Sequence, residues 1–160
     1  MPGFDIEIQE LQEDQPAPMG LLTLADPSVE LINAYLIPGS CFVAMLGEEM
    51  VGAMVLTEFD QFTLEIKNIA VKEAYQGKGI GKQLLQFAEE FGTGQGYKTL
   101  RVGTGNSSIS QLALYQKQGF EITGVIKDFF LTHYDQALYE NGIQCKHMIV
   151  LAKPLVISKI

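Results

Sequence analysis

The alternation of apolar and polar positions predicts mostly strands in the first part of the chain and strand–helix units later. The first part predicts a short edge strand at residues 6–11, a loop at residues 13–20 and a helix at residues 26–39. Asp26 is the expected N-cap of this helix, Pro27 takes its first position, and Pro38-Gly39 ends it. A hairpin of residues 41–46 and 50–58 follows, and then a long strand at residues 62–71.

The second part predicts helices at residues 79–91 and 108–118, because apolar side chains recur there at helical spacing. Strands are expected at residues 99–104, 120–126 and 145–155, with a long aromatic connection at residues 127–144. Strands dominate early and strand–helix–strand units follow, which favours an α/β fold with a mixed sheet. The length of 160 residues is typical of a single domain, expected to span residues 1–160.

Composition and charge narrow the classes of protein. Apolar residues make up 47% and charged residues 19%, as in ordinary globular proteins, and no apolar run is long enough to span a membrane. An acidic N-terminus without an apolar signal region, and two distant cysteines expected to be free thiols (Cys41 and Cys145), favour a cytoplasmic protein. The net charge of −8 opposes nucleic acid as a partner and suits a cationic substrate. No spacing of residues suggests a metal site.

The most informative stretch is the glycine turn "QGKGIGK", which follows an apolar strand and opens a helix. Such a turn can point successive backbone N–H groups at one anion, and the helix N-terminus and two lysines add positive charge. The spacing fails the P-loop pattern and the dinucleotide pattern G-x-G-x-x-G. A phosphate cradle is therefore expected, and a turn that only packs a helix against a strand is the alternative.

The stretch from Gln76 to Gly81 resembles the Q/R-x-x-G-x-G/A signature of the GNAT superfamily, the acetyl-CoA-dependent N-acetyltransferases. A second stretch, "NSSISQLALYQKQGF", is similar to another block of that family. The resemblance covers nearly the whole chain. It implies a mixed, mostly antiparallel sheet flanked by helices, with a wedge for acetyl-CoA between the fourth and fifth strands. It implies direct acetyl transfer to a primary amine; the alternative is a domain of the same fold that binds acyl-CoA without turnover.

The resemblance also implies which residues bind acetyl-CoA. The pyrophosphate would lie on the turn formed by Gln76, Gly77, Lys78, Gly79, Ile80, Gly81 and Lys82, and the pantetheine arm would pair with Ile69, Ala70 and Val71. A bulge is expected there that frees an N–H for the thioester oxygen, with the Val71 amide as the matching group. Asn106 matches a position that hydrogen-bonds the pantetheine or the substrate, although a turn residue is an equal alternative.

Two residues carry the expected proton transfers. Tyr115 matches the general acid that protonates the leaving thiolate. Helical phase places it on the flank of a side formed by Ile109, Leu112, Ala113 and Gln116. A tyrosine with its ring in the core is the alternative. Glu65 matches a strand carboxylate that acts as the base in one branch of the family; a water chain, with Glu65 paired to Lys67, is the alternative.

Residues 127–144 contain Phe129, Phe130, Tyr134 and Tyr139, with Asp128, Asp135 and Glu140 among them. Long loops of this kind are often functional, and an aromatic and acidic loop suits a cation. The alternatives are rings that fill the core or pack a homodimer interface. His133 and His147 are expected to be structural. The acceptor can be a polyamine, an aminoglycoside-like amine, an amino acid, a peptide N-terminus or a protein lysine.

Overall fold

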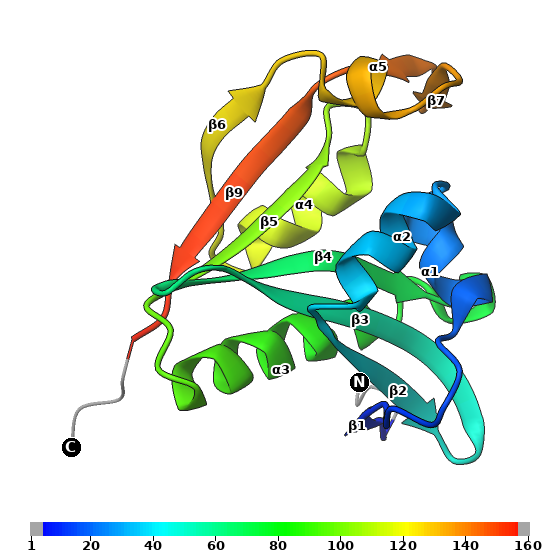
Figure 1. Ribbon diagram of the computed structural model, residues 1–160, viewed down its shortest axis with the longest axis vertical. Coiled ribbons are helices and arrows are strands. Elements are labelled where there is room, and N and C mark those ends of the chain that lie inside the picture. Colours follow the sequence, from blue (N-terminus) through cyan, green and yellow to red (C-terminus); the bar gives the residue numbers. More distant parts are fainter. Residues whose placement is uncertain (1–4, 157–160) are drawn as a thin grey trace.

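The computed structural model describes residues 5–156, which fold around a seven-stranded sheet in the order β1-β2-β3-β4-β5-β9-β6 (Figure 1). β4 and β5 are parallel and all other neighbours are antiparallel, so the expected mixed, mostly antiparallel sheet is confirmed. The strands are β1 (Glu7–Glu10), β2 (Ser40–Leu46), β3 (Glu49–Asp60), β4 (Thr63–Val71), β5 (Thr99–Gly105), β6 (Glu121–Ile126) and β9 (Met148–Pro154).

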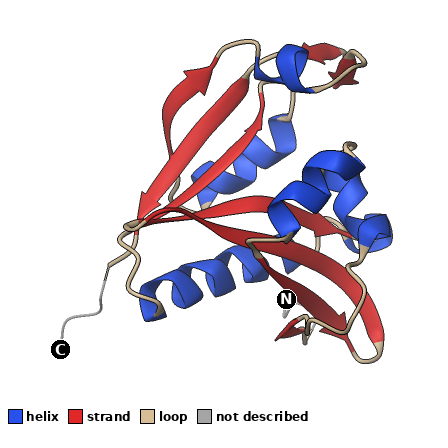
Figure 2. Ribbon diagram, viewed as in Figure 1, coloured by secondary structure: helices blue, strands red, loops and turns tan. Residues whose placement is uncertain are grey.

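Helices cover both faces of this sheet (Figures 1 and 2). α1 (Met19–Ala25) and α2 (Val29–Leu36) pack on one face, where Leu22, Ile32 and Val55 share an apolar cluster. α3 (Ile80–Gly94) and α4 (Ile109–Lys117) lie on the other face over the larger cluster, which includes Leu84 and Leu100. A short 3-10 helix, η1 (Glu73–Tyr75), links β4 to the glycine turn. None of the helices within residues 5–156 has the length and apolar character needed to cross a membrane.

β4 and β5 separate along their length. They pair over only four positions, from Thr63–Thr99 to Ile66–Val102, and beyond these β4 continues along β3 while β5 continues along β9. Figure 1 shows the two halves of the sheet spreading apart from this point. The expected splay between the fourth and fifth strands is therefore present.

A β-bulge lies in β4 at Lys67, because Val55 pairs with Asn68 whereas the next residue of β3, Leu56, pairs with Ile66. The bulge expected at residues 69–71 thus occurs two residues earlier. An extra residue in a strand reverses the alternation of its side chains. Ile66 and Ile69 accordingly both pack in the cluster under α3, whereas Asn68 contacts α1 on the opposite face.

Three expectations about local structure were wrong. The N-cap of α2 is Ser28, whose side chain accepts a hydrogen bond from the Leu31 amide, whereas Asp26 lies at the C-terminal end of α1. α1 itself occupies the end of the predicted loop and the residues after it. Residues 127–144 contain a short helix, α5 (Phe129–His133), and most of a small sheet formed by β7 (Leu138–Glu140) and β8 (Ile143–Cys145).

The burial of α4 goes beyond what its helical phase predicted. Ile109, Ala113 and Gln116 are exposed, whereas Tyr115 is buried in the main core. α4 is short and mixes polar with apolar residues, so its sequence does not indicate which side faces the sheet. The packing of α4 against α3 and β6 decides it.

Candidate active site

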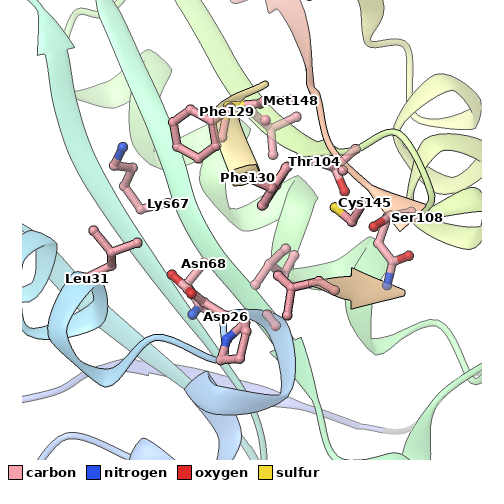
Figure 3. Close-up of a pocket in the computed structure, with 18 of the residues that line it drawn as sticks. Asp26, Leu31, Lys67, Asn68, Thr104, Ser108, Phe129, Phe130, Cys145 and Met148 are labelled. Carbon is pink, nitrogen blue, oxygen red and sulfur yellow. The ribbon is translucent and has the colours of Figure 1, made fainter. Parts of the chain in front are cut away.

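A cleft of about 400 Å³ lies where β4 and β5 separate. Its walls come from α1 and α2, from β4, from β5 and α4, and from the segment between β6 and β9. Figure 3 shows Asn68 and Asp26 close together at one wall and Thr104, Ser108 and Cys145 at the other, with Phe130 between them and Phe129 above. The main lining residues are Asp26, Leu31, Tyr35, Glu65, Ile66, Lys67, Asn68, Ile69, Val102, Thr104, Ser108, Tyr115, Phe129, Phe130, Tyr134, Glu140, Cys145 and Met148.

The glycine turn lies between η1 and α3, beyond the end of β4. Gly77 and Gly79 have φ angles of 74° and 88°, in the region that side chains with a Cβ rarely adopt, and a Cβ at either would point into open space. Gly79 is the N-cap of α3 and no side chain caps the helix there. A helix start without a side-chain cap, preceded by two left-handed glycines, leaves backbone N–H groups available to an anion.

The remaining residues of the turn have different environments. A Cβ at Gly81 would meet Leu114 of α4 at 3.4 Å, so this glycine serves the contact between two helices. The Gln76 side chain donates to the Val71 carbonyl oxygen at 2.9 Å and ties the turn to the end of β4. Lys78 and Lys82 are exposed, and Ile80, the first residue of α3, is buried.

The outer edge of β4 presents backbone amides to the cleft. The Lys72 N–H donates to the Val51 carbonyl oxygen at 2.8 Å, and β3–β4 pairing is regular from Gly52–Val71 to Val55–Asn68. Because bonded and non-bonded pairs alternate in an antiparallel ladder, Asn68 and Ala70 bond to β3. The N–H groups of Ile69 and Val71 therefore point away from β3, toward the gap left by β5. Of these two residues, Ile69 lines the cleft.

Tyr115 reaches the cleft from α4 on the β5 side. Its side chain is almost fully buried and packs beside Phe120, with the ring centres 5.9 Å apart. Burial raises the pKa of the Tyr115 hydroxyl, so it keeps its proton throughout the neutral range. The residue therefore combines features of both expectations, a ring in the core and a place on the cleft wall.

Glu65 also lines the cleft, but it is not a solvated carboxylate. Its side chain is 8% exposed, and its Oε2 accepts a hydrogen bond from the Arg101 guanidinium at 3.0 Å. Lys67 Nζ lies 3.4 Å from the other oxygen, so the expected pairing with Lys67 is present and Arg101 adds a second cation. Two cations around one carboxylate leave this part of the cleft with a net positive charge of one.

Asn106 lies at the end of β5 and binds backbone. Its Oδ1 accepts from the amides of Lys146 and His147, at 2.7 and 2.9 Å, and its Nδ2 donates to the Gln144 carbonyl oxygen at 3.1 Å. These contacts favour the turn residue over the ligand-binding residue. His147 is similarly engaged, since its Nδ1 accepts from the Asp128 amide at 2.9 Å.

A network around Asp26 forms the opposite wall and was missed from the sequence. The Asp26 carboxylate accepts hydrogen bonds from the hydroxyls of Tyr35 and Tyr134, at 3.1 and 2.7 Å, and from the Ser28 amide at 3.1 Å. Asn68 donates to the Tyr35 hydroxyl at 2.9 Å and to the Leu22 carbonyl oxygen at 3.0 Å. Burial raises the pKa of both tyrosines, and so does the Asp26 charge. Asn68, a polar residue directly before the final apolar stretch of the strand, was the available signal.

The segment between β6 and β9 closes the cleft with aromatic rings. Phe129, Phe130 and Tyr134 line it, and the rings of Phe130 and Tyr134 lie 5.4 Å apart. Glu140 adds a carboxylate that accepts from the Ser108 hydroxyl at 2.7 Å. These rings do not fill the core, because Phe129, Phe130 and Tyr134 belong to neither of the two apolar clusters.

Both cysteines are free, as expected, and both are buried. Burial raises the pKa of Cys41 to about 11 and also raises the pKa of Cys145. Among residues 5–156 there is no group of three His, Cys, Asp or Glu side chains that could hold a metal ion.

Sequence comparisons agree with this geometry. The model of the Acetyltransferase (GNAT) family matches residues 7–120. An uncharacterised N-acetyltransferase of Bacillus subtilis (strain 168), YvbK, is 52% identical over 151 residues, which is 94% of this chain and 96% of that protein.

Solved structures give the same result. A GNAT family acetyltransferase from Elizabethkingia anophelis with acetyl-CoA bound has a TM-score of 0.93 and 47% identity, covering 94% of this chain and 99% of that one. A Bacillus subtilis acetyltransferase in complex with CoA has a TM-score of 0.90 and 47% identity, covering 95% of this chain and all of that one, 100%.

Proposed function

The chain belongs to the GNAT family of acetyltransferases and is an N-acetyltransferase, and on this premise we propose that it transfers the acetyl group of acetyl-CoA directly to the primary amine of a positively charged acceptor. The observation that carries this acceptor class is the pair of carboxylates on the cleft wall, Asp26 and Glu140. Neither has an ion-pair partner within residues 5–156, and the rings of Phe129, Phe130 and Tyr134 line the same cleft. Carboxylates and ring faces are the groups that attract an ammonium ion.

The residues that would hold acetyl-CoA form a continuous backbone surface. The amides of residues 77–82 at the start of α3 suit the pyrophosphate, because positive-φ glycines leave open space there. The outward N–H groups of Ile69 and Val71 suit the pantetheine arm as a partner strand. Ala70 bonds to β3 and would contribute only its position in the strand.

The thioester oxygen needs an N–H donor when an amine attacks, because negative charge develops on it. Val71 is the donor that the resemblance implies, but Ile69 also points outward and lines the cleft. We assign the role to Ile69 for this reason, with Val71 as the second candidate. Tyr115, whose hydroxyl holds its proton at neutral pH, would protonate the leaving thiolate.

The attacking amine must lose a proton. Glu65 can accept it only if its contact with Arg101 or Lys67 opens, and the longer contact, with Lys67 at 3.4 Å, is the one to open. The alternative is a water chain, with the ion pair keeping the local charge positive. Positive charge near the amine favours its neutral, reactive form, so either arrangement serves the reaction.

Two measurements test the proposal. Isothermal titration with acetyl-CoA should show binding. A thiol-release assay should then compare tyramine, spermidine, glycine and a short peptide. Tyramine and spermidine should exceed glycine in kcat/KM by about tenfold or more, since Asp26 and Glu140 repel a carboxylate next to the amine. Glycine as the best substrate would overturn the acceptor class, and binding without any thiol release would favour a non-catalytic acyl-CoA-binding protein.

A further inference from the structure

The cleft has two regions of opposite charge. At β4, Glu65 is surrounded by Lys67 and Arg101, so two cations face one carboxylate. Nearer to α1 and α2, Asp26 is half-buried and has no ion-pair partner within the described residues. All its hydrogen bonds come from neutral donors, two tyrosine hydroxyls and one amide. The negative charge of Asp26 is therefore uncompensated in the free protein.

Asn68 adds a second, independent observation at the same wall. Its side chain is buried, and its Nδ2 donates to the Leu22 carbonyl oxygen and to the Tyr35 hydroxyl. A carbonyl oxygen can only accept, so the orientation of the Asn68 amide is determined by this contact. Its Oδ1 consequently has no hydrogen-bond partner among the residues that the structure describes. A buried acceptor without a partner costs free energy, which an N–H donor entering the cleft would recover.

These groups lie together. Figure 3 shows Asn68 and Asp26 facing the same space, and Tyr35 links them through hydrogen bonds to both. Tyr134 reaches Asp26 from the other half of the molecule, and its ring is tilted by 31° against the ring of Phe130. A carboxylate, an unpaired amide oxygen and aromatic rings form a site suited to an ammonium group. We call Asp26, Tyr35, Asn68 and Tyr134 the Asp26 subsite.

The ammonium held there is not the reacting amine. A carboxylate stabilises the charged form of a nearby amine, and the charged form cannot attack a thioester. The reacting amine is better placed near the positively charged set at Glu65, where the neutral form is favoured. We therefore propose that the Asp26 subsite binds a second, non-reacting cation, and that the acceptor is a diamine or polyamine acetylated at its other end. This inference rests on the proposed function.

The test uses pairs of acceptors that differ only in that second charge. Straight-chain diamines of three to six carbons are compared with the amino alcohols of the same length, which replace one ammonium by a neutral hydroxyl. For the best-fitting length, the wild-type KM should be about 10- to 30-fold lower for the diamine. The diamine has two equivalent amines, which by themselves raise its kcat/KM by a factor of about two, and this factor is divided out of the comparison.

Asp26→Asn removes the charge and keeps the shape and the oxygen that accepts from Ser28 and Tyr134. In this variant the diamine should lose its advantage, while the KM of the amino alcohol and the Kd of acetyl-CoA change little. Titration of the diamine into the protein saturated with CoA should show the same loss without turnover. Asp60→Asn is the matched control, because Asp60 is a carboxylate that does not line the cleft, and this variant should keep the preference for the diamine.

Several results would overturn the inference. Equal KM values for diamine and amino alcohol at every length in the wild type would do so, as would an undiminished preference in Asp26→Asn. Loss of the preference in Glu140→Gln but not in Asp26→Asn would place the cation at the other wall. In each case thiol release with monoamines would leave the proposed function standing, whereas no release with any amine would remove both.

Discussion

The proposed acetyl-CoA side of the cleft, which we call the donor side, is built of backbone from one continuous stretch, residues 69–82. The proposed amine side, which we call the acceptor side, is built of side chains from three distant stretches. On the donor side the important features are outward amides, two left-handed glycines and a helix start without a side-chain cap. On the acceptor side, Asp26 and Tyr134 are 108 residues apart and meet in one hydrogen bond of 2.7 Å.

On this proposal, the donor site can stay the same while the acceptor site changes. Backbone amides bind a phosphate or an amide group whichever side chains surround them, provided that the glycines remain. A site made of side chains changes with every substitution. Specificity for the acceptor can therefore vary without disturbing the donor site, and the two sides should respond to mutation separately. The experiments below test that separation.

The largest effect is expected at Tyr115, which lies between the two sides. Tyr115→Phe removes the hydroxyl proton and keeps the ring that packs beside Phe120. We expect kcat to fall by about 10²–10⁴-fold, with the Kd of acetyl-CoA and the KM of the amine nearly unchanged. An unaltered kcat, with chemistry shown to be rate-limiting, would make Tyr115 a structural residue.

The wild-type pH profile gives a control for this assignment. A raised pKa means that the hydroxyl of Tyr115 keeps its proton to higher pH than a free tyrosine, which titrates near pH 10. At pH values up to about 10, deprotonation of Tyr115 should therefore not reduce kcat. A decline between pH 8 and 9 that disappears in Tyr115→Phe would contradict the raised pKa.

Glu65→Gln distinguishes a base from an ion-pair partner. If Glu65 is the base, its replacement should lower the rate at pH 7 by about 10²-fold or more. The rate should recover partly at high pH, where the amine arrives neutral. If a water chain removes the proton, the loss should be a few-fold and the shape of the pH profile should be kept. The second pattern, in a variant with normal acetyl-CoA affinity, would end the case for Glu65 as base.

Gly79→Asp tests the donor side alone. A side chain and a negative charge at the start of α3 should weaken acetyl-CoA binding by about 30- to 100-fold, measured by titration. Gly96→Asp is the matched control, because Gly96 has nearly the same φ angle (90°, against 88° at Gly79) and equally open surroundings. Gly96 lies just beyond the other end of α3. Equal losses of affinity in both variants would point to backbone strain and contradict phosphate binding by the glycine turn.

Tyr134→Phe tests the acceptor side and should have the smallest effect. It breaks the bond to Asp26 that joins the two halves of the molecule. The loss of a hydrogen bond to a charged group should lower Tm by about 3–6 °C, and KM for the amine should rise a few-fold. The affinity for acetyl-CoA should stay constant. If that affinity changed as much as KM for the amine, the two sides would be coupled.

The sequence by itself determined the fold class and the donor side. The apolar periods placed the hairpin, the long strand before the turn and the α3 helix, and the glycine spacing placed the turn that we propose to bind the pyrophosphate. These features depend on neighbouring residues, because a turn or a helix start is decided by the conformations that a few consecutive residues can adopt.

The tertiary structure alone decided the acceptor side. The bulge at Lys67 turned Asn68 toward α1, and packing against the sheet turned Tyr115 inward although the sequence of α4 did not indicate it. Asp26 was expected to cap a helix and instead binds two tyrosines, one of them from the far end of the chain. Such contacts join residues that no local pattern relates. They form only when the whole sheet has brought its two halves together, so they cannot be read from neighbouring positions in the sequence.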